Sequence, residues 1–359
     1  MCLIHFIYGA LCFVCDTIYN DYIILLWSAI DAPAGVLVYG MSSTTDSEDR
    51  SLSEIGAFLS PFDHDDADVT LRSSDKLEFH VHKLILSTSS PFFKSMFSLP
   101  QTDATVSLNQ KPIIDLQENG QTIAVLLTQI YPVVSATTEP ETLDEIVDAL
   151  AAAQKYDMAA VSQRLNEKFT QSKFMQDDPI AAFCAAYSRE LAIPARAAAK
   201  ASLKRRMNLD SIEDQLEYTN GPAFHKLYKF HRACSAAAVQ AVSGTHLTWI
   251  TPSQTWWDLT NVSQLCVCGR YNYTIPVGSG SATWQASSPY HDFIMRTINV
   301  LADHPCCEAV ANYSFLTPSY KKAGCIHCRV TLLGLPEFSH LLGEEVERLV
   351  SMVRFYIIP

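Results

Sequence analysis

The chain has 359 residues, 48% of them hydrophobic and 18% charged, which excludes a largely disordered protein and is enough for two domain cores. Its net charge of −12 repels a phosphate backbone, so broad electrostatic binding to DNA or RNA is not expected. The basic run 204–206 is interpreted as a solvated helix end whose charges complement the helix dipole.

Residues 1–40 form an apolar N-terminal segment whose role the sequence leaves open. They contain two apolar runs, 2–15 and 22–30, separated by polar residues that include Asp16 and Asp21. A membrane-spanning helix needs about 20 mostly apolar residues, and neither run is long enough. No basic region precedes the first run and no clear cleavage site follows it, as a signal peptide would require.

Three interpretations of this N-terminus remain open. Residues 1–30 are a membrane anchor or uncleaved signal, an extra packed helix, or the product of a start codon placed too far upstream. Residues 41–62 then read as a polar linker, and Met41 is a plausible true start.

The cysteines favour a reduced, intracellular protein in the cytoplasm or nucleus. There are eleven, an odd number, and they are scattered rather than spaced like the framework of a small secreted domain. The competing interpretation is a membrane-anchored or secreted protein, which the apolar N-terminus and the glycosylation triplets at Asn261, Asn272 and Asn312 would support. Such triplets often arise by chance, so this interpretation is not favoured.

Residues 63–99 predict a hairpin followed by two short helices. Alternating runs at 68–72 and 76–81 are separated by a polar turn, and from His82 the pattern becomes helical. Pro91 is suited to the first position of the second helix. That helix is apolar on nearly every side, so its large side chains are all expected in the core; they are Phe92, Phe93, Met96 and Phe97.

A third strand and three helices are predicted next. Residues 111–116 read as a strand whose Pro112 confines it to an edge or a strand's first position. Residues 120–131 carry an apolar helical stripe. Thr142 and Glu145 form a capping box that opens another helix, and a further helix runs through 161–169.

These elements in this order resemble the BTB (POZ) domain, in particular that of BTB proteins from filamentous and mushroom-forming fungi. The resemblance rests on VHKLIL, SSPFFKSMF and AAAQKYDM and covers about residues 63–173. It implies an α+β fold in which a small sheet caps a cluster of helices, followed by a mostly helical C-terminal domain at 174–359.

The resemblance also implies roles for residues. Asp68 and Lys83 match the acidic and basic residues of a charged interaction pocket near the homodimer groove of the family. An equally weighted interpretation is a local pair of half-buried charges, since an unpaired buried charge is costly. His82 matches the junction between strand and helix, where it is interpreted as a hydrogen-bonded structural residue.

The function that the resemblance implies is protein–protein interaction through homo- or hetero-oligomerisation, without catalysis. A homodimer and unidentified protein partners are therefore expected, and nucleic acid is not. The alternative is a substrate adaptor of a cullin-type ubiquitin ligase, but residues 98–103 read SLPQTD where such adaptors commonly carry an apolar-x-Glu step. Kelch repeats and a regular zinc-finger array are absent from the sequence.

The C-terminal domain predicts further helices, the last at 338–352, and a tryptophan-rich stretch. Trp249, Trp256 and Trp257 are either a binding platform or anchors of a small irregular core. No hydrolase elbow, phosphate loop or zinc-protease motif occurs, and Gly278-Ser-Gly280 lacks the third glycine and the preceding apolar strand of a dinucleotide site. The chain is therefore predicted not to be an enzyme.

Two close cysteine pairs are the candidate metal ligands. Cys266 and Cys268 form one pair and Cys325 and Cys328 the other, and four thiolates from two such knuckles complete a tetrahedral structural zinc site. Four further side chains are candidate substitutes: His304, Cys306, Cys307 and His327. The alternatives are buried free thiols or a redox-active pair.

Overall fold

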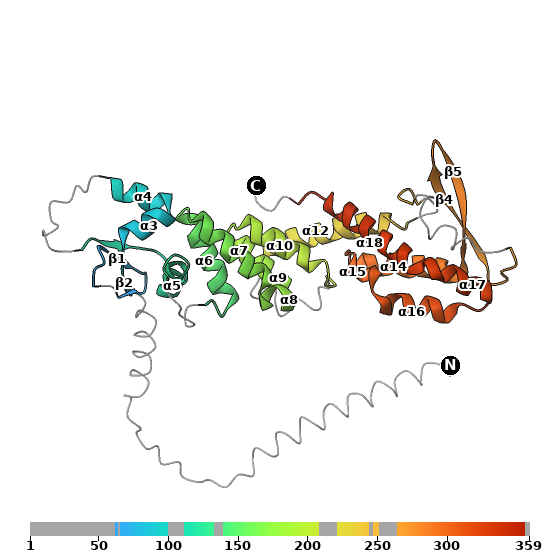
Figure 1. Ribbon diagram of the computed structural model, residues 1–359, viewed down its shortest axis with the longest axis horizontal. Helices are drawn as coiled ribbons and strands as arrows, with labels where there is room; N and C mark the ends of the chain where they lie inside the picture. Colours follow the sequence, from blue (N-terminus) through green and yellow to red (C-terminus); the bar gives the residue numbers. More distant parts are fainter. Residues whose placement is uncertain are drawn as a thin grey trace, which may run out of the picture. The chain divides into compact units, whose positions relative to one another are not determined.

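The computed structural model describes residues 62–63, 65–99, 111–132, 139–207, 221–243, 247–250 and 264–355 (Figure 1). The predictions for residues 1–40, for the linker up to residue 61, and for Trp256 and Trp257 lie outside these residues. All described residues belong to one compact unit that spans Ile55–Pro359. No helix in the described ranges is long and apolar enough to cross a bilayer.

The first part of the chain folds into a three-stranded sheet and a cluster of helices, and Figure 1 shows α3, α4 and α5 beside the sheet. The sheet order is β2-β1-β3, with β1 antiparallel to β2 and parallel to β3. The elements are β1 Val69–Arg72, β2 Glu78–Val81, α3 Lys83–Ser89, α4 Pro91–Ser98, β3 Ile113–Asp115, α5 Gly120–Thr128, α6 Leu143–Lys155 and α7 Ala159–Gln171. The predicted hairpin, edge strand and capping box of Thr142 and Glu145 are confirmed.

The sequence motifs SSPFFKSMF and AAAQKYDM contact each other in the folded chain. The Ser90 hydroxyl donates to the backbone carbonyl of Tyr156 at 2.5 Å and accepts the N–H of Phe93 at 3.1 Å, which caps α4. The Phe93 and Tyr156 rings stack with centroids 5.1 Å apart. These contacts tie the start of α4 to the end of α6.

The prediction that every large side chain of α4 lies in the core is wrong. Phe93 is buried and Met96 and Phe97 are half-buried, but Phe92 is 43% exposed. The Phe92 ring lies at the edge of the packed side, where it contacts the rings of Phe93 and Tyr156, both with centroids 5.4 Å away, and its outer part remains exposed. An apolar surface on α4 is therefore left uncovered by the described residues.

The second part of the chain is mostly helical, as predicted, and also contains a hairpin. Its elements are α8 Lys173–Asp177, α9 Pro179–Ser188, α10 Ala192–Ser202, α12 Gly221–Gln240, β4 Arg270–Val277, β5 Gly280–Ser287, α14 Ser288–Asp303, α15 Glu308–Ala311, α16 Tyr313–Lys322, α17 Ile326–Thr331, η3 Leu332–Gly334 and α18 Leu335–Ser351. The predicted last helix thus begins three residues earlier, with Pro336 in its first turn.

The hairpin β4–β5 was not predicted. Gly278, with φ +56°, and Ser279 form its two-residue turn, and Tyr273 pairs with Trp284 across the strands. A strand, β4, does precede Gly278, but it is largely exposed rather than the apolar strand of a dinucleotide site, and the turn is that of a hairpin. The alternation of Tyr271, Tyr273, Ile275 and Val277 before this turn was the available sequence signal.

Two hydrophobic cores run through the described residues. The first joins the sheet and α3–α7 to α9, α10 and the first half of α12, with Phe183, Ala195 and Leu227 among its buried side chains. The second is built from α14, α18 and the hairpin. The first core therefore continues beyond residue 173, and the domain boundary at that residue stays a prediction.

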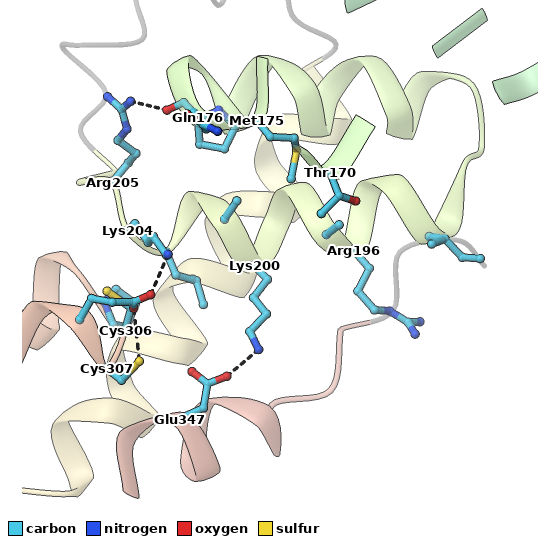
Figure 2. A pocket seen from close by; sticks show the side chains of 17 residues that line it. Thr170, Met175, Gln176, Arg196, Lys200, Lys204, Arg205, Cys306, Cys307 and Glu347 are labelled. Carbon is cyan, nitrogen blue, oxygen red and sulfur yellow. Dashed lines mark hydrogen bonds and ion pairs between the residues drawn. The ribbon is translucent and has the colours of Figure 1, made fainter. Parts of the chain in front are cut away.

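Ion pairs link α10 to α18 and α15 (Figure 2). The Lys200 ammonium lies 2.5 Å from Glu347 of α18, and the Lys204 ammonium, just beyond α10, lies 2.7 Å from Glu308 of α15. The bond from Lys204 lowers the pKa of the Glu308 carboxyl to about 2. The carboxylate therefore stays ionised over the whole physiological pH range.

Candidate interaction surface and metal centre

A hydrogen bond connects Asp68 and Lys83, the two predicted pocket residues. The Asp68 carboxylate accepts the backbone N–H of Lys83 at 2.7 Å. Lys83 is the first residue of α3, whose N-cap His82 makes no side-chain cap of its own, so Asp68 satisfies one of the free amides at this helix end. The Lys83 ammonium lies 5.9 Å from the centre of the Phe97 ring.

His82 lies between two oxygen groups. Its Nε2 is 3.2 Å from Asp66, and its Nδ1 is 3.1 Å from the Tyr131 hydroxyl, which also accepts the His82 backbone N–H at 2.8 Å. Burial raises the pKa of the Tyr131 hydroxyl, and the charges of Asp68 and Asp66 add to this rise. Tyr131 was missed in the sequence because no local pattern indicates a contact 49 residues away.

Apolar side chains are exposed on both helices that follow this junction. Leu84 of α3 is 76% exposed and Leu99, just after α4, is 65% exposed. A groove of about 530 Å³ runs along α4 to the end of α6, and it is lined by Pro91, Phe92, Ser95, Met96, Leu99, Lys155 and Asp157. Phe92 and Leu99 are both exposed and both line this groove, and such grouped apolar side chains are typical of a protein-binding surface.

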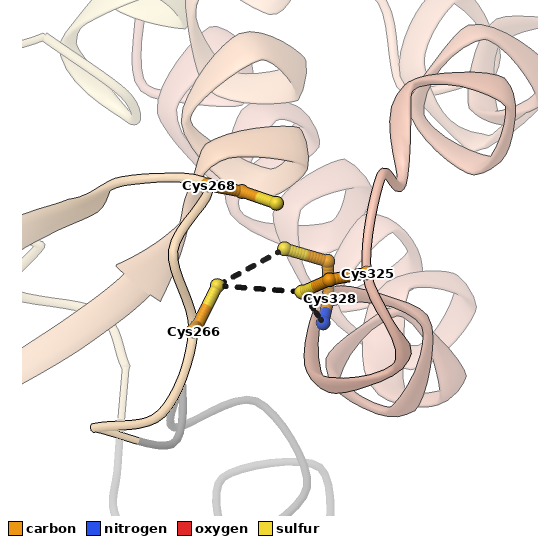
Figure 3. Close-up of side chains that lie close together, drawn as sticks. All are labelled: Cys266, Cys268, Cys325 and Cys328. Atoms are coloured by element: carbon orange, nitrogen blue, oxygen red, sulfur yellow. Dashed lines mark hydrogen bonds between the residues drawn. The ribbon is translucent and has the colours of Figure 1, made fainter.

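The four predicted cysteines come together although 59 residues separate Cys266 from Cys325 (Figure 3). Their sulfur atoms all lie within 4.8 Å of one another. The Cys266 sulfur is 3.7 Å from that of Cys325 and 3.4 Å from that of Cys328. The candidate substitutes His304, Cys306, Cys307 and His327 do not belong to this cluster in the described part of the chain.

Local structure positions each cysteine pair. Gly269 has φ +104°, a conformation that favours glycine, and it lets the chain turn directly from Cys268 into β4. Cys325 is the N-cap of α17, and its sulfur accepts the backbone N–H of Cys328 at 3.4 Å. This bond is the main cause that lowers the pKa of the Cys325 thiol to about 6.

The separations within the cluster are compatible with four thiolates around one metal ion. Sulfur atoms bound at about 2.3 Å to one zinc ion lie about 3.8 Å apart, close to the separations found here. Cys328 and Cys266 are buried while Cys268 and Cys325 are half-buried, which is typical of a knuckle site at the edge of a core. The four thiols therefore could hold a metal ion.

The described residues up to 173 thus form a small sheet beside a cluster of helices, with an aspartate-capped helix start at the junction between them. Residues 59–173 match the family model of the BTB/POZ domain. This part of the chain has the BTB/POZ fold, and a mostly helical part follows it. No curated protein matches the chain.

Proposed function

We propose that the protein is a non-catalytic interaction module that forms a homodimer through its BTB domain and docks other proteins. The match of residues 59–173 to the BTB/POZ family carries this proposal. The resemblance implies a homodimer groove near Asp68 and Lys83, and Leu84, the next residue of α3, is 76% exposed. A second copy of the chain would remove this leucine from water.

Leu84→Asp is expected to weaken the homodimer because a carboxylate would be buried in its interface. The expected cost is about 2 kcal/mol or more, roughly a 30-fold rise in the dissociation constant. Light scattering on the full chain over a range of concentrations measures this change. Leu99→Asp, at a similarly exposed site after α4, is the matched control and keeps the wild-type affinity. A wild-type chain that stays strictly monomeric contradicts the homodimer.

The cullin-adaptor function is a second candidate because some BTB proteins hold a cullin at the surface after the helix that corresponds to α4, and a groove lined by α4 and Leu99 is present here. Met96 and Leu99 give this groove apolar contacts, although Leu99 and its neighbours lack the usual glutamate. A purified cullin N-terminal domain is expected to be retained by the wild type and not by Leu99→Asp. No retention of the cullin by the wild type rejects this candidate.

We further propose that the four-cysteine cluster holds a structural zinc ion. The ion would join the segment before β4 to the start of α17 and so close the second core. The mutual distances of the four sulfur atoms support this, as does the N–H that Cys328 gives to Cys325. Zinc in such a site contributes to folding and carries out no reaction.

The proposed location is the cytoplasm or nucleus, in keeping with a thiol-based zinc site, which needs reduced cysteines. The eight described cysteines all carry free thiols. The likeness to fungal BTB proteins belongs to this proposal as well. A membrane-anchored or secreted protein remains the alternative, and equal localisation of the full chain and of a version that starts at Met41 would reject it.

A further inference from the structure

A pocket of about 890 Å³ lies between α8 and α10 on one side and α15 and α18 on the other (Figure 2). Most of the residues that line it follow residue 173, the end of the region that matches the BTB family. Neither the cysteine cluster nor the proposed BTB interface contributes to it. Met175 and Leu203 are buried in its floor, whereas Ile193 is 70% exposed.

One face of α10, continued by the turn that follows it, supplies a regular pattern of side chains to this pocket. Arg196, Lys200 and Lys204 follow one another at four-residue intervals, and all three line the pocket. Apolar residues at the same interval, Ile193, Ala197 and Ala201, line it as well. Spacings of three and four residues place both rows on one side of the helix, with successive cations about 6 Å apart.

The pocket carries more positive than negative charge. Lys200 and Lys204 are paired with Glu347 and Glu308. The Arg205 guanidinium donates to the backbone carbonyls of Gln176 and Asp177, at 2.7 and 3.1 Å, and carbonyls carry no formal charge.

Arg196 is exposed and makes no ion pair with any residue that the structure describes. Two cations are thus left uncompensated in a chain whose net charge is −12. An anionic occupant would neutralise both of them.

We propose that this pocket binds an acidic amphipathic helix of a partner protein. Carboxylates two to three turns apart on such a helix would reach Arg196 and Arg205, the two cations that form no ion pair with the described residues. Ala197 and Ala201 are small enough for the backbone of a second helix to approach closely, and Ile193 would pack on its apolar side chains. The cations from Arg196 to Lys204 extend over about two helical turns, roughly 12 Å, a length that suits a peptide better than a compact small anion.

The test uses the full-length protein and a fluorescein-labelled synthetic helix of 16 residues, with Glu at successive turns beside a Leu and Ala stripe. Fluorescence anisotropy measures its binding. A second peptide carries Gln in place of every Glu, and a third has the residues of the first in an order that spreads Glu and Leu around the helix. Both are expected to bind at least tenfold more weakly than the first peptide. Equal binding of all three, or no binding of the first, overturns the proposal.

Protein variants locate the binding in this pocket. Arg196→Glu and Ile193→Asp are each expected to weaken binding of the first peptide at least tenfold, since both side chains are exposed and the fold does not depend on them. Lys229→Glu on α12 reverses an equally exposed charge outside the pocket and is expected to leave binding unchanged. Equal effects of Arg196→Glu and Lys229→Glu would show only general charge attraction and reject the site. A second copy of the chain is the other occupant that the pocket could take, and light scattering with the first peptide present tests it. If the peptide dissociates a dimer of the protein, the pocket belongs to the dimer interface and the proposal of a partner helix is rejected.

Discussion

One zinc ion per chain is the expected result of metal analysis by mass spectrometry on the purified full-length protein, and Cys328→Ser is expected to lose it. Three remaining thiolates bind zinc far more weakly than four, because the serine hydroxyl does not ionise near neutral pH. Zinc that binds only the folded chain stabilises it by about 2.7 kcal/mol at a free concentration 100 times the dissociation constant. Loss of the ion is therefore expected to lower the stability of the second core by a few kcal/mol.

Cys325→Ser tests the role of Cys325 as a metal ligand separately from its role as the N-cap of α17. Serine is a good N-cap residue and can accept the Cys328 N–H that the Cys325 sulfur now accepts, so α17 keeps its cap while the metal ligand is lost. Cys307→Ser, at a half-buried cysteine outside the cluster, is the matched control and retains the zinc. Full zinc content in Cys325→Ser or Cys328→Ser, or a metal-free wild type grown with zinc, contradicts the proposal.

Phe338→Ala is expected to destabilise the protein by about 3–5 kcal/mol, the range found when a large buried aromatic side chain is truncated. Phe338 is fully buried in α18, and four aromatic rings surround it with centroids 5.6 to 6.0 Å away: Trp249, Trp284, Tyr290 and Phe293. The cavity left by the ring would lie where the hairpin, α14 and α18 meet. These rings cannot close it without moving the backbone of several elements.

Urea denaturation followed by tryptophan fluorescence measures this loss, since Trp249 and Trp284 both contact the Phe338 ring. Tyr313→Ala is the matched control: Tyr313 is 77% exposed on α16, so its removal is expected to change stability by no more than about 0.5 kcal/mol. Unfolding midpoints that coincide for Phe338→Ala and the wild type would show that the second core is not organised around this ring.

The three proposed interaction features involve different residues, so their tests are independent. Leu84 belongs to the BTB homodimer, Leu99 to the groove along α4, and Arg196 to the pocket beside α10. A variant at one of them is expected to leave the other two functions intact, because effects at distant sites are usually additive.

The sequence alone determined the elements of the BTB domain. Alternation at 68–72 and 76–81, Pro91 at the start of α4 and the capping box of Thr142 each depend on neighbours a few residues away. The two cysteines of each pair are also only two or three residues apart, so the sequence alone predicted both pairs as candidate metal ligands.

Only the tertiary structure decided which of these residues meet and which stay uncovered. It brings Cys266 next to Cys325 across 59 residues, lets Asp68 cap the helix that begins at Lys83, and leaves Phe92 exposed on a helix that looked apolar all round. Periodicity states which residues share a face of an element. Whether that face is covered depends on the packing of segments that are distant in sequence, and that packing has no local signature.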